Sequence, residues 1–257
     1  MAKLNALLMP SAVAPSPDTP FQALVDPGIR LGQTIKAINY WVRRANKFNF
    51  RIMVVDNTNF AEQIRAALPQ RTLKSQLLEI HDLPRLAPED TKRGKGAGET
   101  STLIQGLALL NLSPNANVAK VNARYITTNG LYLIDELEDD FDFAAWPRPY
   151  LDSVDTTFFV GKAGFLQQAF AYVYAETDDL KEKFVENLYA DYSIRNTACR
   201  YQRFNYSPAI KGQSGTTGSK ASPLNEFRIV SFIVRVRKVF RKTLSFIKPG
   251  YQRGARK

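Results

Sequence analysis

The sequence predicts an α/β fold in which helices flank a mostly parallel sheet. Residues 49–56 form a largely apolar run that ends in Asp56-Asn57-Thr58, a pattern typical of a parallel strand buried on both faces. Residues 29–45 before this run, and residues 100–110 after it, place apolar side chains at helical spacing. Alternating strands and helices favour parallel crossover units.

Further apolar patterns extend this alternation along the chain. The expected strands are residues 3–9, closed by Pro10, and residues 77–80, 119–127, 130–134 and 156–160. The expected helices are residues 60–68, 163–174 and 179–189. Polar loops are expected at residues 11–27, 84–98 and 135–142.

The positive charge is concentrated at the C-terminal end. The chain has 257 residues and a net charge of +11. Residues 224–257 hold ten Lys or Arg and one acid, whereas the other 223 residues hold 25 basic and 23 acidic side chains. A protein that binds nucleic acid through its main domain carries a basic face there, so no nucleic-acid partner is expected.

Composition divides the chain into three segments. Residues 1–212 are expected to form the catalytic domain, residues 213–223 a Gly- and Ser-rich flexible linker, and residues 224–257 a basic tail. Cys199 is the one cysteine, which excludes an intrachain disulfide and fits a reducing compartment. No apolar run approaches the 18 residues that a membrane span needs.

The tail has the pattern of an amphipathic helix on an anionic membrane surface. Its apolar face includes Phe232, Val236 and Phe240, and its basic face includes Arg235, Lys238, Arg241 and Lys242. Two alternatives stay open: the apolar face packs on the protein's own core, or the tail binds nucleic acid. We expect a cytoplasmic protein held peripherally on the inner face of the membrane.

Two segments carry polar residues where a ligand would meet the sheet. Asp56 and Asn57 follow a predicted strand, and open parallel sheets bind ligands at that edge, although the same residues suit a simple turn. Lys95, Gly96 and Glu99 precede the helix at residues 100–110, where free backbone N–H groups attract anions. The alternative is a flexible glycine loop.

Two later segments carry charges on or near strands. Asn122 and Arg124 share one face of a predicted strand, and a buried Arg needs an anion, which is either a ligand or a structural carboxylate. Asp155 precedes an aromatic strand and is a candidate general base, or else part of a capped loop. His81 is the only histidine, which excludes a metal site built on histidines.

These four segments, in this order, resemble bacterial glycosyltransferases of the GT-A type that build capsule and O-antigen polysaccharides. The resemblance covers about residues 3–190 and implies a nucleotide-sugar donor bound over the sheet edge. The donor-binding candidates are Arg30, Asp56, Asn57, Lys95, Gly96, Asn122 and Arg124. The catalytic candidates are Asp155, then Glu99 and Glu186, and the acceptor-stacking candidates are Trp146 and Tyr150.

The chain departs from that family at one informative place. Most GT-A enzymes carry Asp-x-Asp on the central strand to hold a divalent metal, but this sequence has Asn122-Ala123-Arg124 there. We therefore expect no metal and no cofactor, with Arg124 and Lys95 neutralising the donor diphosphate. The expected partners are a nucleotide sugar, a lipid-linked glycan acceptor and the anionic membrane.

Two other functions remain as alternatives. A sugar nucleotidyltransferase shares this sheet, but it needs a glycine-rich loop after the first strand, where this chain has Pro10-Ser11-Ala12. A non-catalytic membrane scaffold would keep the fold and bind no nucleotide.

Overall fold

The computed structural model describes residues 3–17, 19, 23–84, 87, 92–196, 198–213 and 220–221. The chain divides into two compact units, residues 1–222 and 223–257, and all the described residues belong to the first. The predicted membrane helix therefore lies outside the described residues. Within the described part, no helix combines the length and hydropathy needed to cross a bilayer.

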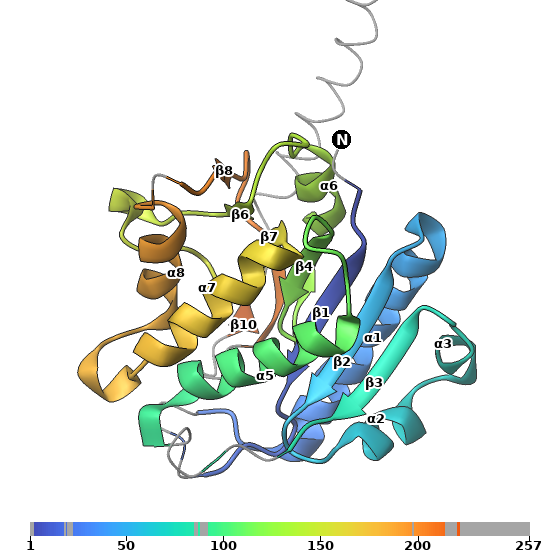
Figure 1. The fold of residues 1–257 in the computed structure, drawn as a ribbon. Coiled ribbons are helices and arrows are strands. Elements are labelled where there is room, and N and C mark those ends of the chain that lie inside the picture. Colours follow the sequence, from blue (N-terminus) through green and yellow to red (C-terminus); the bar gives the residue numbers. More distant parts are fainter. Residues whose placement is uncertain are drawn as a thin grey trace, which may run out of the picture. The chain divides into compact units, whose positions relative to one another are not determined.

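Seven strands form the central sheet in the order β3-β2-β1-β4-β7-β6-β8. They are β1 (Ala6–Ser11), β2 (Arg51–Asp56), β3 (Leu78–Asp82), β4 (Asn117–Val121), β6 (Phe143–Ala145), β7 (Phe158–Lys162) and β8 (Tyr201–Arg203). β1 to β4 pair in parallel, while β7 is antiparallel to both of its neighbours. The predicted α/β class with a mostly parallel sheet is confirmed (Figure 1).

Helices cover both faces of this sheet. Leu7 and Met9 of β1 belong to one core, and Ala6 and Leu8 belong to the other, as the alternation of a strand requires. The first core includes α1 (Pro27–Phe48), α2 (Ala61–Ala67) and α6 (Gly130–Asp135). The second includes α5 (Lys95–Leu110), α7 (Ala163–Glu176) and α8 (Val185–Ser193).

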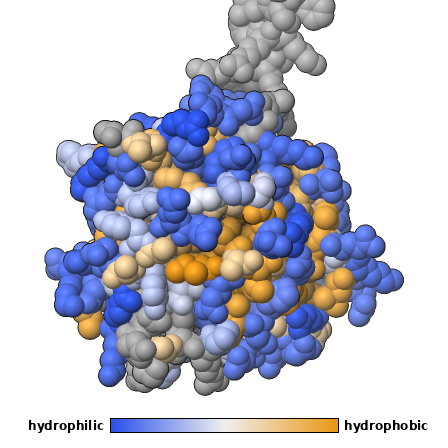
Figure 2. All heavy atoms as spheres, viewed as in Figure 1, coloured by the Kyte–Doolittle hydropathy of each residue, from blue (hydrophilic) through white to orange (hydrophobic). Residues whose placement is uncertain are grey.

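Figure 1 shows α5 and α7 lying in front of the strands. The surface on this side is mostly hydrophilic, with hydrophobic side chains gathered near the middle of the view (Figure 2). The remaining short helices are α3 (Gln70–Leu73), η1 (Pro149–Leu151) and η2 (Asp179–Lys181).

A second, three-stranded sheet has the order β10-β9-β5. Its strands are β5 (Ile126–Thr127), β9 (Ile210–Gln213) and β10 (Lys220–Ala221), all antiparallel. The predicted linker is wrong at Gln213, Lys220 and Ala221, which belong to these strands. Strand pairing uses main-chain groups, so polar residues can take part without producing an apolar pattern in the sequence.

Several predicted elements differ from the structure. Residues 130–134 are helical rather than extended, because a short apolar run satisfies either periodicity. Residues 119–127 are not one strand: the chain turns after Val121, where Tyr125 N donates to Asn122 O at 2.9 Å. Residues 95–98 already belong to α5, and residues 179–189 are divided between η2 and α8.

Pro10 does not end the first strand. β1 continues to Ser11, and Pro10 pairs with Val55 of β2. Pairing with β4 reaches only Leu8, so the N–H that Pro10 lacks is not needed by the β1–β4 ladder. The Pro10 carbonyl instead accepts from Ala123 N at 2.9 Å, which fixes the turn after β4 beside the end of β1.

Candidate functional site

A cavity of about 370 Å³ lies at the carboxyl ends of β1, β2 and β4, where it is lined by Ser11, Asn57 and Asn122. It occupies the point where the strand order reverses, with β2 on one side of β1 and β4 on the other. Open α/β sheets bind ligands at such switch points. The cavity is therefore the strongest candidate site in the described part of the chain.

Six of the twelve predicted catalytic, donor-binding and acceptor-binding residues line this cavity. They are Arg30, Asn57, Lys95, Glu99, Asn122 and Arg124. The other predicted residues are not part of its lining. They are Asp56, Gly96, Trp146, Tyr150, Asp155 and Glu186.

Asp56 shapes the cavity wall from behind it. It is fully buried, and its Oδ2 accepts from Val13 N at 3.1 Å. Its Oδ1 accepts from Thr58 N at 2.8 Å and from Thr58 Oγ1 at 2.5 Å. Asp56 is buried and is not among the residues that line the cavity, so its predicted contact with the donor stays a prediction. It holds the loop after β1 in place.

Arg30 reaches the cavity from the first turn of α1. This helix begins at Pro27 because Asp26 Oδ1 accepts from Ile29 N at 2.8 Å and proline suits the first helical position. Arg30 is 2% exposed and donates to two carbonyls, Ala12 O at 2.7 Å and Leu24 O at 2.8 Å. Burial and the charge of Arg124 lower the pKa of Arg30 to about 9, against the attraction of Asp56.

Arg124 lies in the turn after β4 and is 6% exposed. Its Nη1 donates to Gln213 O of β9 at 3.0 Å, and its Cζ lies 5.4 Å from the centre of the Tyr125 ring. This close approach of β9 requires Gly212, which has φ 154°. A Cβ there would lie 2.4 Å from the Tyr125 ring.

The two arginines have no carboxylate ion-pair partner in the described part of the chain. Buried cations are normally paired, and like charges near one another are costly. Lys95 adds a third basic residue to the same cavity lining. The cavity therefore favours an anionic occupant.

The side-chain amide of Asn57 has an orientation that its hydrogen bond to Thr102 determines. Thr102 Oγ1 donates its one proton to Gly98 O at 2.9 Å, so it accepts from Asn57 Nδ2 at 2.8 Å. The Asn57 carbonyl oxygen is left as a hydrogen-bond acceptor. Nearby, Ser11 Oγ is buried without a hydrogen-bond partner among the described residues. This end of the cavity thus offers polar groups suited to a ligand with N–H or O–H donors.

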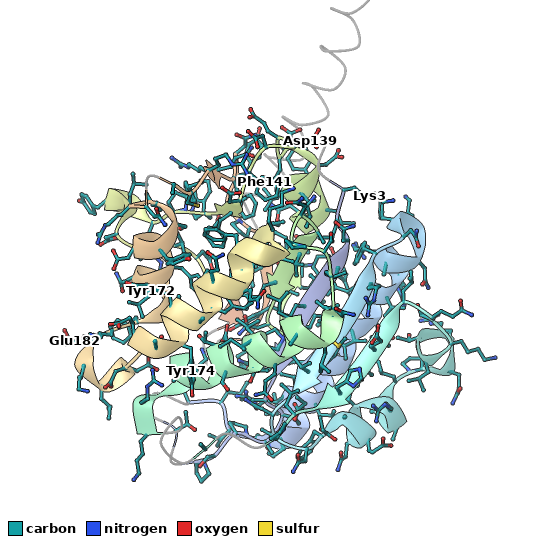
Figure 3. All side chains as sticks on the ribbon, in the orientation of Figure 1. Lys3, Asp139, Phe141, Tyr172, Tyr174 and Glu182 are labelled. Atoms are coloured by element: carbon teal, nitrogen blue, oxygen red, sulfur yellow. The ribbon has the colours of Figure 1, made fainter. Side chains whose placement is uncertain are left out.

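The N-terminal end of α5 is occupied by a carboxylate of the protein itself. Gly96 N donates to Asp179 Oδ2 at 3.1 Å, and burial raises the pKa of Asp179 against this bond. Gly94 has φ 110°, and a Cβ there would lie 2.4 Å from Asp179. The N–H of Gly96 is thus used within the protein, and its predicted contact with a donor stays a prediction. Arg93, just before α5, places its Cζ 4.9 Å from the centre of the ring of Tyr174 on α7. Tyr174 is labelled in Figure 3.

Lys120, which the sequence patterns did not single out, organises the part of the lining that Glu99 and Asn122 form. This β4 residue is 1% exposed. Its ammonium donates to Glu99 Oε1, to Asn122 Oδ1, and to Thr156 O at 2.6 Å. Asn122 Nδ2 in turn donates to Glu99 Oε2 at 2.9 Å, which closes the ring of three side chains. The only available signal was a lysine among the apolar residues Val118, Ala119 and Val121 of the strand.

Glu99 is held as a carboxylate by this network. Burial alone would raise its pKa, but the charges of Lys120 and Lys95 and the hydrogen bonds from Lys120 and Asn122 lower the pKa of Glu99 to about 2. A general base works best with a pKa near the working pH. Glu99 is thus better suited to orienting Asn122 than to accepting a proton.

Asp155 and Glu186 lie on either side of Thr156. Asp155 Oδ1 accepts from Thr157 N at 2.8 Å. Glu186 is on α8, where its Oε1 accepts from Thr156 Oγ1 at 3.5 Å and its carbonyl accepts from Val154 N at 3.1 Å. All three predicted catalytic carboxylates therefore lie around the Lys120 network, although only Glu99 reaches the cavity.

The two predicted acceptor-stacking aromatics lie outside the cavity. Trp146 O accepts from Asp155 N at 2.8 Å, and the Trp146 ring lies 4.6 Å from Arg203 Cζ. Tyr150 is 95% exposed and has φ 74°, a strained value for a tyrosine. Trp146 is thus next to a candidate base, whereas Tyr150 projects from the surface of its loop.

The residues of the cavity do not fit a divalent metal. Glu99 is the one carboxylate among the described residues that line the cavity, and both of its oxygens are already bonded. Across the described residues, no group of three or more His, Cys, Asp or Glu side chains could hold a metal ion. Divalent metals in donor sites prefer carboxylate oxygens, and the described lining residues offer amide and guanidinium groups instead.

Comparisons with known proteins give distant structural matches. No family model matches the chain, and no curated protein matches its sequence. A galactosyltransferase, LgtC, solved with donor and acceptor sugar analogues, shares 10% identity with a TM-score of 0.48 over 77% of this chain and 72% of its own. A provisionally named nucleotide-diphospho-sugar transferase from Desulfovibrio desulfuricans G20 shares 10% identity with a TM-score of 0.47, over 79% and 80%.

A provisionally named glucose-1-phosphate thymidylyltransferase from Bacillus anthracis is similar to the same extent. It shares 10% identity with a TM-score of 0.46, over 83% of this chain and 90% of its own. At this distance, the matches leave the function to be argued from the cavity itself.

Proposed function

We propose that this chain is a glycosyltransferase that moves a sugar from a nucleotide-diphosphate donor to a glycan acceptor. The observation that carries the proposal is the pair Arg30 and Arg124, two buried cations in one cavity wall with carbonyl partners only. A diphosphate between them would supply the negative charge that the attraction of Asp56 for Arg30 does not balance. The order of motifs that resembles GT-A enzymes agrees with this assignment.

In this proposal, Arg124 and Lys95 stabilise the charge that develops on the leaving diphosphate. A guanidinium can donate two parallel hydrogen bonds to phosphate oxygens. Preorganised donors of this kind lower the barrier where charge appears in the transition state. Asn57 and Ser11 bind the nucleoside part of the donor, because they offer an oriented acceptor and an uncommitted hydroxyl.

We propose that transfer needs no metal. The place where related enzymes carry two acidic metal ligands holds Asn122 and Arg124 in this chain. Arg124 then performs the charge neutralisation that the metal supplies elsewhere. Sugar nucleotidyl transfer is disfavoured because the loop after β1, which lines the cavity with Pro15 and Pro17, is not glycine-rich.

Asp155 is our candidate for the base that activates the acceptor, and Glu186 is second. Asp155 lies beside Trp146, whose ring is suited to stack on a sugar. Glu99 has both oxygens bonded and orients Asn122. Replacing Asp155 with Asn should reduce turnover strongly and leave nucleotide binding intact. Near-normal turnover in that variant would remove Asp155 from the mechanism.

We further propose that the acceptor is lipid-linked, as in capsule and O-antigen synthesis, and that the tail holds the enzyme on the cytoplasmic face of the membrane. The support is the amphipathic pattern of residues 227–248. Co-sedimentation with anionic vesicles tests this. The full chain should pellet and a chain ending at Ser222 should not, and equal binding by both would exclude the tail as the anchor.

The direct test of the activity is turnover of a panel of UDP-, GDP- and dTDP-sugars in the presence of EDTA. We expect release of the nucleoside diphosphate from at least one donor. A non-catalytic scaffold predicts no turnover with any donor. Activity that disappears in EDTA and returns with Mn²⁺ or Mg²⁺ would contradict the metal-free part of the proposal.

A further inference from the structure

The Lys120 network connects two parts of the molecule that the reaction must bring together. On one side it includes Glu99 and Asn122, which line the cavity. On the other it includes the carbonyl of Thr156, the residue directly after Asp155. Lys120 Nζ is the atom that contacts both sides.

Each N–H of the Lys120 ammonium group has a hydrogen-bond acceptor within the protein. It has three N–H groups and three acceptors: Glu99 Oε1, Asn122 Oδ1 and Thr156 O. Its side chain is 1% exposed, and Nζ lies 5.6 Å from the centre of the Phe159 ring. A cation so enclosed cannot itself reach a substrate, so its effect on a reaction must pass through the groups that it holds.

Two consequences follow for those groups. Asn122 has its amide orientation fixed, because its oxygen accepts from Lys120 and one N–H goes to Glu99, so its second N–H is available to the cavity. The loop from Val154 to Thr157 is held at Thr156 by a charge-assisted hydrogen bond, which is stronger than a neutral one. Asp155 is therefore held at a set distance from the cavity.

We propose that Lys120 is a positioning residue for the reaction: its buried ammonium fixes the Asp155 loop against the donor cavity. This inference rests on the proposed glycosyltransferase function. It adds a residue that does not touch the substrate. Its role is to keep Asp155, the candidate base for the acceptor, at a fixed position relative to the donor cavity.

The test uses Lys120→Met, which keeps the length of the side chain and removes the ammonium. We expect hydrogen exchange at residues 154–157 to rise about tenfold, the effect of losing one charge-assisted hydrogen bond. Turnover should fall at least about tenfold, because small misplacements of a catalytic group are costly. Affinity for the nucleoside diphosphate that the wild type binds should stay within about threefold.

A second variant distinguishes loss of positioning from misfolding of the protein. Lys120→Met alone leaves Glu99 buried without its cation, so Lys120→Met combined with Glu99→Gln removes both charges together. The double variant should fold, bind the nucleotide and still show the mobile loop and low turnover. Lys162→Met is the matched control, because Lys162 pairs with Asn117 at the opposite end of β4 and should change neither readout.

The outcomes separate this inference from the proposed function. Wild-type turnover in a folded Lys120→Met or double variant would overturn the positioning role. A parallel loss of turnover and nucleotide affinity would also overturn it, because it would mean that the cavity has collapsed. A wild-type protein that turns over no donor refutes the proposed function before any variant is compared, and the inference falls with it.

Discussion

Two groups of buried cations lie at the cavity, Lys120 in one wall and Arg30 with Arg124 in the other, and they have different kinds of partner. On one wall, Lys120 is paired with a carboxylate and has an acceptor for each of its N–H groups. On the other, Arg30 and Arg124 donate to carbonyls, and each lies within reach of the other's charge. Lys120 is 1% exposed, Arg30 2% and Arg124 6%, so the three cations differ in their partners rather than in their burial.

That difference distinguishes a structural charge from one arranged for a ligand. Removing one member of a buried pair is strongly destabilising, whereas removing one of two like charges relieves repulsion. Groups held in an unfavourable environment inside a cleft are candidates for function. The following predictions test whether the two walls separate in this way.

The largest effect is expected on turnover in Arg124→Ala. Loss of one preorganised donor to the leaving group typically costs about 10²–10³ in kcat. Stability should hardly change or should increase, because Arg30 loses a like-charged neighbour. Steady-state kinetics and thermal unfolding of the same variant give both numbers.

Arg195→Ala is the control for that variant. Arg195 follows α8 and forms an exposed ion pair with Asp191 of that helix, so its loss should change neither turnover nor thermal stability. A fall in Tm without loss of turnover would show that Arg124 is a structural residue like Lys120.

The second prediction concerns stability and sharpens the comparison directly. Lys120→Met should lower the free energy of unfolding by about 3–5 kcal/mol, the cost of leaving a buried charge without its partner. Arg124→Met should lower it by much less or raise it. Urea unfolding of the two variants side by side measures the difference. Equal losses would mean that the two walls do not differ.

The third prediction concerns pH. The folded protein lowers the pKa of Glu99 to about 2 from an ordinary value of 4.5. Protons therefore bind Glu99 more readily in the unfolded chain, and its stabilising contribution is complete above pH 4.5. The contribution should disappear as the pH falls from 4.5 towards 2.

Unfolding curves of the wild type and Glu99→Gln should accordingly differ at pH 7 and converge in acid. A constant difference across this range would show that the Glu99 carboxylate has an ordinary pKa.

The smallest effect is expected in Thr102→Val. This change removes the hydroxyl that orients the Asn57 amide, so nucleotide binding should weaken by about tenfold, the typical worth of one hydrogen bond. Thr100→Val removes a similar helix back-bond, to Gly96 O, from a residue that does not line the cavity. If both variants lose affinity equally, the orientation of Asn57 is not the cause.

The sequence predicted the part of the fold that depends on local patterns. Residues 49–56 were recognisable as a strand because they are apolar on both faces, and Asn57 follows that strand at the cavity edge. Asn122 and Arg124, which the sequence also singled out, line the cavity, although they lie in a turn rather than in a strand. Arg124 could be singled out because a charged side chain among apolar neighbours indicates an anionic partner.

The rest depended on contacts between distant residues. The carboxylate of Asp179 reaches α5 from 83 residues away in the sequence, so nothing local indicated that the N–H of Gly96 was already used. The two oxygens of Asp56 are used by Val13 and Thr58, which lie on different loops. Lys120 was missed because its partners come from α5, from β4's own end and from the loop before β7.

The central claim is that Arg30 and Arg124 form an unpaired cationic site for the diphosphate of a nucleotide donor. Calorimetric titration with UDP, GDP and dTDP in EDTA tests it most directly, on the wild type and on Arg30→Met/Arg124→Met. We expect that the wild type binds at least one of them without metal and that the double variant stays folded and binds none. Equal binding by both proteins, or binding that requires a divalent metal, would contradict it.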